Sequence, residues 1–189
     1  MNKPQNKLAL VTGASRAVGI GAAIARQLAQ AGMDIFITYY RAYDHESGLA
    51  GQADEPHQLL QEIRAMGCNA DGLELDLSDA SAPEQLFKHV EAKLGPVSVL
   101  VNNATYSMRD GIENLDAASL DKHYAVNIRG MALLCATFVR RYQENFPGGK
   151  DGRIINLSSG QSVGPMPGEL AYAATKGAVD AFTVSLSAE

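Results

Sequence analysis

The segment Leu8-Ala-Leu-Val-Thr-Gly-Ala-Ser-Arg-Ala-Val-Gly-Ile-Gly21 decides the fold, because it joins a short apolar run to three closely spaced glycines. From Ile20 onward, apolar residues recur at helical spacing as far as Ala31, and Gly32 can end a helix there. The segment therefore predicts a strand, a tight turn and a helix. Glycines in such a turn allow close approach of a ligand, and the amides at the helix N-terminus favour an anion such as phosphate. If only the glycines are considered, a turn that connects two elements and binds no ligand is as well supported as a phosphate-binding turn.

Apolar runs typical of strands alternate with helical patterns along the rest of the chain. Strands are predicted near residues 34–39, 70–75, 97–101 and 152–157, and helices near 55–66, 81–94, 116–146 and from about 170. This alternation favours parallel strands with right-handed crossovers and helices on both faces of the sheet. We therefore predict an α/β fold, a Rossmann-like doubly wound parallel sheet, in a single domain over residues 1–189.

Several local patterns add detail to this prediction. Ser81-Ala-Pro-Glu84 matches a capping box at the start of a helix. Residues 41–56 are polar and aperiodic and are expected to form an exposed loop. The four histidines lack the spacing of metal ligands, so no metal site is expected. Cys68 and Cys135 are far apart in the chain and are expected to be buried, unreactive thiols.

The composition argues against two classes of partner. Sixteen Lys and Arg residues against 21 Asp and Glu residues give a net charge of −5, and no basic stretch stands out, so we expect no nucleic-acid binding. The longest apolar run, residues 131–139, is too short to span a membrane, and the first seven residues lack the apolar segment of a signal peptide. We therefore expect a cytoplasmic protein that does not bind membranes.

Tyr172 and Lys176 are four residues apart in the last predicted helix and thus share one face of it. An ammonium group near a phenol stabilises the phenolate and lets the phenol act as a general acid or base nearer neutral pH. A solvated aromatic side chain beside a lysine is the ordinary alternative for such a pair. Ser159 follows the last predicted strand, where open α/β sheets bind ligands, and its hydroxyl could donate to a substrate carbonyl. Taken alone, Ser158 and Ser159 would be an ordinary pair of loop residues.

These features combined resemble the short-chain dehydrogenase/reductase family, from Leu8 to the end of the chain. Residues 12–21 are similar to the family's TGxxxGxG turn, with two extra residues before the last two glycines. Residues 102–105 are similar to its NNAG motif, with Thr105 in place of the glycine. Tyr172 and Lys176 match its YxxxK motif. No Gly-Lys-Ser/Thr follows the glycines, which argues against a kinase or NTPase.

The resemblance implies a role for each residue of a catalytic tetrad. Tyr172 would be the acid/base, and Lys176 would lower its pKa and hold the nicotinamide ribose. Ser159 would orient and polarise the carbonyl. Asn127, which lies in a segment similar to the family's helix motif, would support Lys176 through water. For Asn127, a hydrogen bond within its own helix is the alternative.

The resemblance also implies a dinucleotide cofactor at the carboxyl ends of the strands. Asp76 would bond the adenine amino group, or it could form a turn. No carboxylate ends the second predicted strand, and Arg16 and Arg41 could pair with a 2′-phosphate, so NADP is expected over NAD. Residues 41–56 leave NAD possible, because they could bring Asp44 or Glu46 near. The expected contacts are Gly13, Ser15, Arg16, Gly19, Ile20, Gly21, Arg41, Asp76, Leu77, Asn103, Ala104, Tyr172 and Lys176.

The expected reaction is hydride transfer between nicotinamide and a carbonyl or hydroxyl carbon of a small molecule. The chain resembles β-ketoacyl-carrier-protein reductases, which implies a 3-oxoacyl thioester or another ketone as substrate. The alternative is a non-catalytic dinucleotide-binding or assembly module, or an inactive fragment. The helices at 116–146 and 171–186 have apolar faces, and in the family that the chain resembles these helices form a dimer interface, so the resemblance implies a homodimer or homotetramer. Relatives continue with two further strands beyond the tyrosine-bearing helix, so the C-terminal part of the sheet is expected to be missing.

Overall fold

The computed structural model describes residues 7–189, and the predicted absence of a signal peptide concerns residues that lie largely outside this range. A five-stranded sheet forms its centre, and every neighbouring pair of strands is parallel. The strand order is β3-β2-β1-β4-β5. This confirms the predicted doubly wound, Rossmann-like sheet. The strands are β1 (Leu8–Val11), β2 (Asp34–Tyr39), β3 (Ala70–Glu74), β4 (Val97–Asn102) and β5 (Arg153–Asn156).

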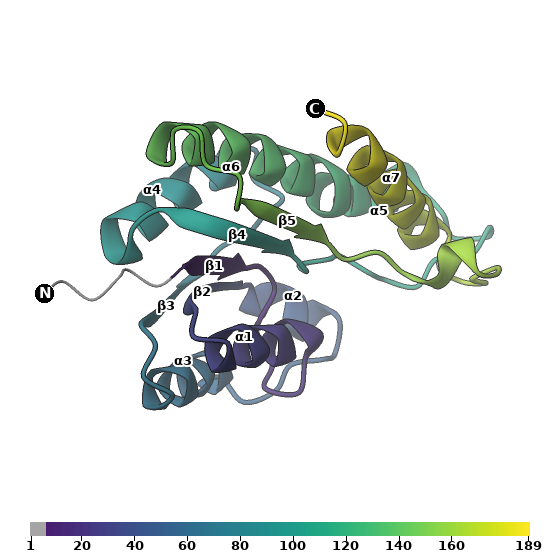
Figure 1. Cartoon of the computed structure of the whole chain (residues 1–189). Coiled ribbons are helices and arrows are strands. Elements are labelled where there is room, and N and C mark those ends of the chain that lie inside the picture. The colour runs from purple at the N-terminus through teal and green to yellow at the C-terminus, as the bar shows by residue number, and fades with distance from the viewer. Residues whose placement is uncertain (1–6) are drawn as a thin grey trace, which may run out of the picture.

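Helices cover both faces of the sheet (Figure 1). One face carries α1 and α3, and the opposite face carries α4 and α6, with α7 beside α5. A π-helical turn, η1 (Ala125–Gly130), connects α5 directly to α6. The helices are α1 (Ile20–Gln30), α2 (Arg41–Glu46), α3 (Glu55–Ala65), α4 (Ala82–Leu94), α5 (Ala117–Tyr124), α6 (Met131–Asn145), the 3-10 turn η2 (Gly160–Ser162) and α7 (Leu170–Leu186).

Two hydrophobic cores fix the sheet between these helices. Successive side chains of β2 enter opposite cores, because a strand alternates its side chains between the two faces of a sheet. Phe36 packs in the core that contains α4 and α6, whereas Ile35 and Ile37 pack in the core that contains α1 and α3. β2 is therefore buried along nearly its whole length, which is typical of a parallel strand covered on both faces. The carboxyl ends of the strands remain available for a site.

Two local predictions were wrong. Residues 41–56 do not form a loop throughout, since they contain α2 and the start of α3. A helix as short as α2 depends on contacts with distant residues, which sequence periodicity cannot reveal. The capping box at residues 81–84 is also not formed. The hydroxyl of Ser81 donates to Asp79 at 2.8 Å, and Glu84 instead pairs with Arg140 and Arg141.

None of the helices within residues 7–189 combines the length and the apolar character that crossing a membrane requires.

Candidate active site

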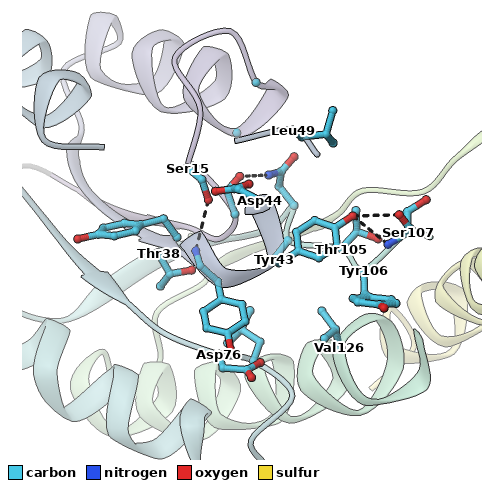
Figure 2. A pocket seen from close by; sticks show the side chains of 18 of the residues that line it. Ser15, Thr38, Tyr43, Asp44, Leu49, Asp76, Thr105, Tyr106, Ser107 and Val126 are labelled. Atoms are coloured by element: carbon cyan, nitrogen blue, oxygen red, sulfur yellow. Dashed lines mark hydrogen bonds between the residues drawn. The ribbon is translucent and has the colours of Figure 1, made fainter. Parts of the chain in front are cut away.

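A cavity of about 500 Å³ lies at the carboxyl ends of β1 to β4. Figure 2 shows part of its lining, which comes from the glycine turn after β1, from α2 and from the segments after β3 and β4. Because these strands are parallel, their carboxyl ends meet at one edge of the sheet. The cavity brings together many of the predicted cofactor contacts, namely Gly13, Ser15, Arg16, Gly19, Ile20, Gly21, Asp76, Leu77, Asn103 and Ala104.

Gly13 and Gly21 of the turn lie so close to other parts of the protein that a side chain would not fit, whether or not a ligand is bound. Gly13 has a φ of 73°, and a Cβ on it would lie 2.6 Å from the Cα of Ala104. A Cβ on Gly21 would lie 2.6 Å from Nδ2 of the Asn103 side-chain amide. That same amide donates to the carbonyls of Thr12 and Gly13, each at 2.9 Å. The turn is thus packed and hydrogen-bonded against the end of β4, a reason for glycine that the sequence did not reveal.

Arg41, just after β2, does not lie where the predicted contact with a 2′-phosphate requires it. Its guanidinium donates to the carbonyl of Gly51 at 3.1 Å and lies 3.6 Å from the carboxylate of Asp44, and Arg41 is not among the residues that line the cavity. Asp44 and Glu46 do line it, as does Arg16. Arg41 is on α2, and the direction of its side chain follows from that short helix, which the sequence did not predict.

Asp44 is a buried carboxylate beside the glycine turn (Figure 2), with 4% of its surface exposed. Burial raises the pKa of Asp44, an effect opposed by the hydroxyl of Ser15 and the charges of Arg41 and Arg16. Its Oδ2 atom makes no hydrogen bond within the described residues. The atom is itself buried, and the guanidinium of Arg41 lies 3.6 Å from it.

Asp76 follows β3 and faces the same cavity. Its carboxylate accepts a hydrogen bond from the backbone amide of Ser78 at 2.8 Å, so it forms the local turn that the sequence allowed as an alternative. Tyr40, at the end of β2, also lines the cavity. Burial, and next the carboxylate of Asp76, raises the pKa of Tyr40. The phenol of Tyr40 and the carboxylate of Asp76 thus form one polar wall.

Lys176 and Tyr172 lie together on α7 as predicted. The ammonium group of Lys176 is 5.6 Å from the centre of the Tyr172 ring and donates to the carbonyl of Leu157, just after β5, at 2.8 Å. Lys176 is only 4% exposed, and this burial lowers its pKa, with Asp180 opposing the effect. Tyr172 is partly buried. The structure therefore places a buried cation next to a phenol that solvent can reach.

Asn127 lies in the π-helical turn, a kind of irregularity that is frequent at functional sites. Its side chain accepts from the amide of Tyr106 at 2.7 Å and from the hydroxyl of Thr105 at 3.1 Å. It donates to the carbonyl of Tyr106 at 2.9 Å and to the hydroxyl of Thr175 at 3.0 Å. Asn127 thus ties the segment after β4 to the residue before Lys176. Thr105, which replaces the glycine of the NNAG motif, adds one of these bonds.

None of the four predicted catalytic residues is among the residues that line the cavity. Tyr106 and Val126 belong to the lining and adjoin Asn127, Tyr106 by a hydrogen bond and Val126 in sequence. Ser159 is partly buried and directly precedes η2. Asn127 thus links the lining to α7, through Tyr106 on one side and Thr175 on the other. Within residues 7–189, no group of three or more His, Cys, Asp or Glu side chains could hold a metal ion.

Asp110 is a buried carboxylate that the sequence did not indicate, bonded to the first turn of α7. Its carboxylate is 3% exposed and accepts from the amide of Ala171 through both oxygens, at 3.2 and 3.3 Å. Its Oδ2 also accepts from the hydroxyl of Ser119 at 3.2 Å. A negative charge at a helix N-terminus is stabilising, and this one contacts the residue before Tyr172. Asp110 is 61 positions from Ala171, so no local pattern could have revealed it.

A comparison with protein families matches residues 7–189 to the family described as short chain dehydrogenase. The chain belongs to this family. It is 47% identical to the uncharacterized oxidoreductase YjdA of Bacillus subtilis over all of its own length and 71% of that protein. It is 31% identical to the 3-oxoacyl-[acyl-carrier-protein] reductase FabG of Staphylococcus aureus, over 97% of this chain and 68% of FabG.

Solved structures agree with this assignment. A short chain dehydrogenase from Burkholderia cenocepacia, determined in complex with NADP, is 32% identical and superposes with a TM-score of 0.82. The match covers 98% of this chain and 69% of that one. The predicted family and its likeness to 3-oxoacyl reductases are thus confirmed. This short chain dehydrogenase is an NAD(P)-dependent oxidoreductase of the class that acts on CH–OH and C=O groups.

The cavity of this short chain dehydrogenase suits a dinucleotide. It has an arginine at the glycine turn for a phosphate, and its lining lies at the carboxyl ends of four parallel strands. Several lining residues were not predicted from the sequence. They belong to α2 and to the segments facing it, where only the tertiary structure brings them together: Tyr43, Leu49, Tyr106, Ser107, Lys122 and Val126.

Proposed function

We propose that this protein is an NADP-dependent reductase of small-molecule ketones, which also runs in reverse as an alcohol dehydrogenase. One observation carries the proposal. The buried ammonium group of Lys176 is fixed by the carbonyl of Leu157 and lies 5.6 Å from the centre of the Tyr172 ring. Both residues are on α7, which Asn127 joins to the lining of the cavity. A fixed cation next to a phenol favours proton transfer by that phenol.

The bound nicotinamide would supply or accept the hydride. Tyr172 would donate the proton that the carbonyl oxygen takes up during reduction, and it would remove that proton during oxidation. Lys176 would stabilise the phenolate that remains after donation. The hydroxyl of Ser159 would hydrogen-bond the carbonyl oxygen and strengthen its polarisation. Asn127 would act indirectly, because its side chain holds Thr175 and thereby the turn of α7 that carries Lys176.

The preference for NADP over NAD rests on Arg16. Its position in the glycine turn, among the residues that line the cavity, suits a 2′-phosphate on the adenosine ribose. Related short chain dehydrogenases have been solved with NADP, including those from Burkholderia cenocepacia and from a metagenome. Arg41 does not support the preference, because its guanidinium contacts Gly51 and Asp44.

The substrate class that we propose is a 3-oxoacyl thioester or another ketone. The support is the likeness to FabG of Staphylococcus aureus, which is named a 3-oxoacyl-[acyl-carrier-protein] reductase. We also propose a cytoplasmic homodimer or homotetramer. Leu120, Leu133 and Val184, on the helices expected to form the contact, are 44%, 36% and 73% exposed. Light scattering tests the oligomer, and a monomer would contradict it.

The proposed function is tested by measuring the rate of NADPH oxidation, from the loss of NADPH absorbance, with a panel of ketones and 3-oxoacyl thioesters as substrates. We expect turnover of at least one class, and a lower KM for NADPH than for NADH. A clear preference for NADH would reject the role of Arg16 and leave the reaction class intact. Tight NADPH binding without turnover of any substrate would favour the alternative of a non-catalytic dinucleotide-binding module.

A further inference from the structure

Helix α2 connects two sides of the cavity that are distant in sequence. It follows β2, and its Tyr43 reaches the segment after β4. The hydroxyl of Tyr43 donates to the carbonyl of Ser107 and accepts from the amide of Ser107, both at 3.1 Å (Figure 2). The rings of Tyr43 and Tyr106 are also in contact, with centres 5.3 Å apart. One side chain of α2 is thus hydrogen-bonded to the main chain of the segment after β4, on the other side of the cavity.

The end of α2 makes a second connection, to α5. Glu46 accepts from the ammonium group of Lys122 at 2.8 Å and from the hydroxyl of Tyr106 at 3.2 Å. The ammonium group of Lys122 also lies 5.6 Å from the centre of the Tyr106 ring. The hydrogen bond from Lys122 lowers the pKa of Glu46 below its ordinary value. Glu46, Lys122 and Tyr106 form a small polar cluster that joins α2 to the far wall.

These contacts are suited to opening and closing. Glu46 and Lys122 have side chains 44% and 56% exposed, and exposed ion pairs are weak. A helix of six residues is not stable by itself, so the position of α2 depends on its contacts across the cavity. Tyr43, Glu46, Tyr106, Ser107 and Lys122 all line the cavity, so the bridge crosses the space proposed for the dinucleotide.

We infer that α2 is a strap that closes over the bound dinucleotide, and that Glu46 and Tyr43 latch it and thereby set the rate of cofactor release. The inference rests on the proposed function, because the ligand in question is NADP(H). Glu46 and Lys122 are positioning residues here, acting on the cofactor through the position of α2. Nothing in the reaction chemistry requires them.

The experiment is a displacement measurement on the whole chain, with the fluorescence of bound NADPH followed after mixing with excess NADP. Replacing Glu46 by Gln or Lys122 by Met removes the ion pair and should raise the dissociation rate about two- to fivefold. Tyr43→Phe removes two hydrogen bonds to the main chain of Ser107 and should raise it about tenfold. The double variant E46Q/K122M should dissociate no faster than the faster single variant, because both changes break the same contact.

Matched controls lie outside the cavity. Glu84 is 49% exposed and pairs with two arginines of α6, and the hydroxyl of Tyr142 accepts from the amide of Asp151 at 3.2 Å. Glu84→Gln and Tyr142→Phe should leave the dissociation rate unchanged. Circular dichroism checks that each variant folds, and the charge exchange E46K/K122E should recover most of the slow release if Glu46→Gln does not fold.

Two failures are distinguishable. If a titration shows that the unmodified protein does not bind NADPH, both the proposed function and the strap are wrong. If the protein binds NADPH and Glu46→Gln, Lys122→Met and Tyr43→Phe release it at the unmodified rate, only the strap is wrong. Equal acceleration by the control variants would also overturn the strap, because the effect would then be general to the fold.

Discussion

The glycine turn and the N-terminal half of α7 lie at the same edge of the sheet, but different interactions hold them. The turn is fixed by close packing and by neutral hydrogen bonds, chiefly those of Asn103 to Thr12 and Gly13. The half-helix is fixed by buried ionisable side chains, with Lys176 bonded to a carbonyl and Asp110 to a helix amide. The turn should therefore be intolerant of added atoms, whereas α7 should be intolerant of lost charge.

The largest effect should follow loss of the charge on α7. Lys176→Met keeps a long side chain in the buried site but removes the cation beside Tyr172. We expect kcat for ketone reduction to fall about 10²-fold or more, since the phenolate loses its stabilising charge. Steady-state kinetics measure this. Lys93→Met, at an exposed position near the end of α4, is the control, and a kcat for Lys176→Met close to that of the control would refute the role.

Adding one methyl group to the turn should have the next largest effect. Gly13→Ala places a Cβ 2.6 Å from the Cα of Ala104 on a backbone with positive φ. We expect the free energy of unfolding to fall by about 1–3 kcal/mol, and NADPH binding to weaken with it. Gly32→Ala is the matched control, because Gly32 also has positive φ but would place its Cβ in open space. Urea unfolding of both proteins compares them, and equal losses would remove the packing argument.

Asp110→Ala probes the other buried charge at α7. It leaves the amide of Ala171 without its partner, and we expect a loss of about 1–2 kcal/mol in unfolding free energy. Because Tyr172 follows Ala171, kcat should also fall, by about tenfold, while NADPH affinity stays the same. Kinetics and a binding titration separate the two quantities. Asp79→Ala, at an exposed turn before α4, should leave kcat unchanged, and a similar fall there would contradict positioning by Asp110.

The smallest expected effect concerns the thiols of Cys68 and Cys135, which belong neither to the glycine turn nor to α7. Burial raises the pKa of Cys135 to about 11 and raises that of Cys68 as well. The thiolate is the reactive form, so alkylation of the folded protein near about pH 8 should be slow at both positions and should not alter turnover. Mass spectrometry after iodoacetamide treatment tests this, with urea-unfolded protein as the control. Rapid labelling of folded Cys135 would contradict its buried position.

The sequence was sufficient where the information is local. The apolar run from Leu8 and the spacing of its glycines predicted the first strand, turn and helix, and the spacing of Tyr172 and Lys176 predicted their shared face. In both cases the relevant residues are close together in the sequence, so their spacing is enough to predict the local structure. The parallel direction of the strands likewise follows from the regular alternation of strands and helices.

The sequence was insufficient where distant segments meet. Helix α2 is too short to show a period, and its contact from Tyr43 to Ser107 spans 64 positions. The direction of Arg41 depends on that helix, so the predicted contact with a phosphate has no support in the structure. The bond from Asp110 to Ala171 likewise spans 61 positions. In each case the tertiary structure, which no local pattern encodes, decides which polar groups meet.

The most direct test of the central claim is the single-turnover rate of NADPH oxidation by a ketone substrate, with the cofactor saturating. Tyr172→Phe removes only the phenolic hydroxyl that the account makes the proton donor. We predict a rate about 10²- to 10⁴-fold lower than that of the unmodified protein, with the dissociation constant for NADPH unchanged within about twofold. Equal single-turnover rates for the two proteins would contradict the assignment of Tyr172 as the acid/base.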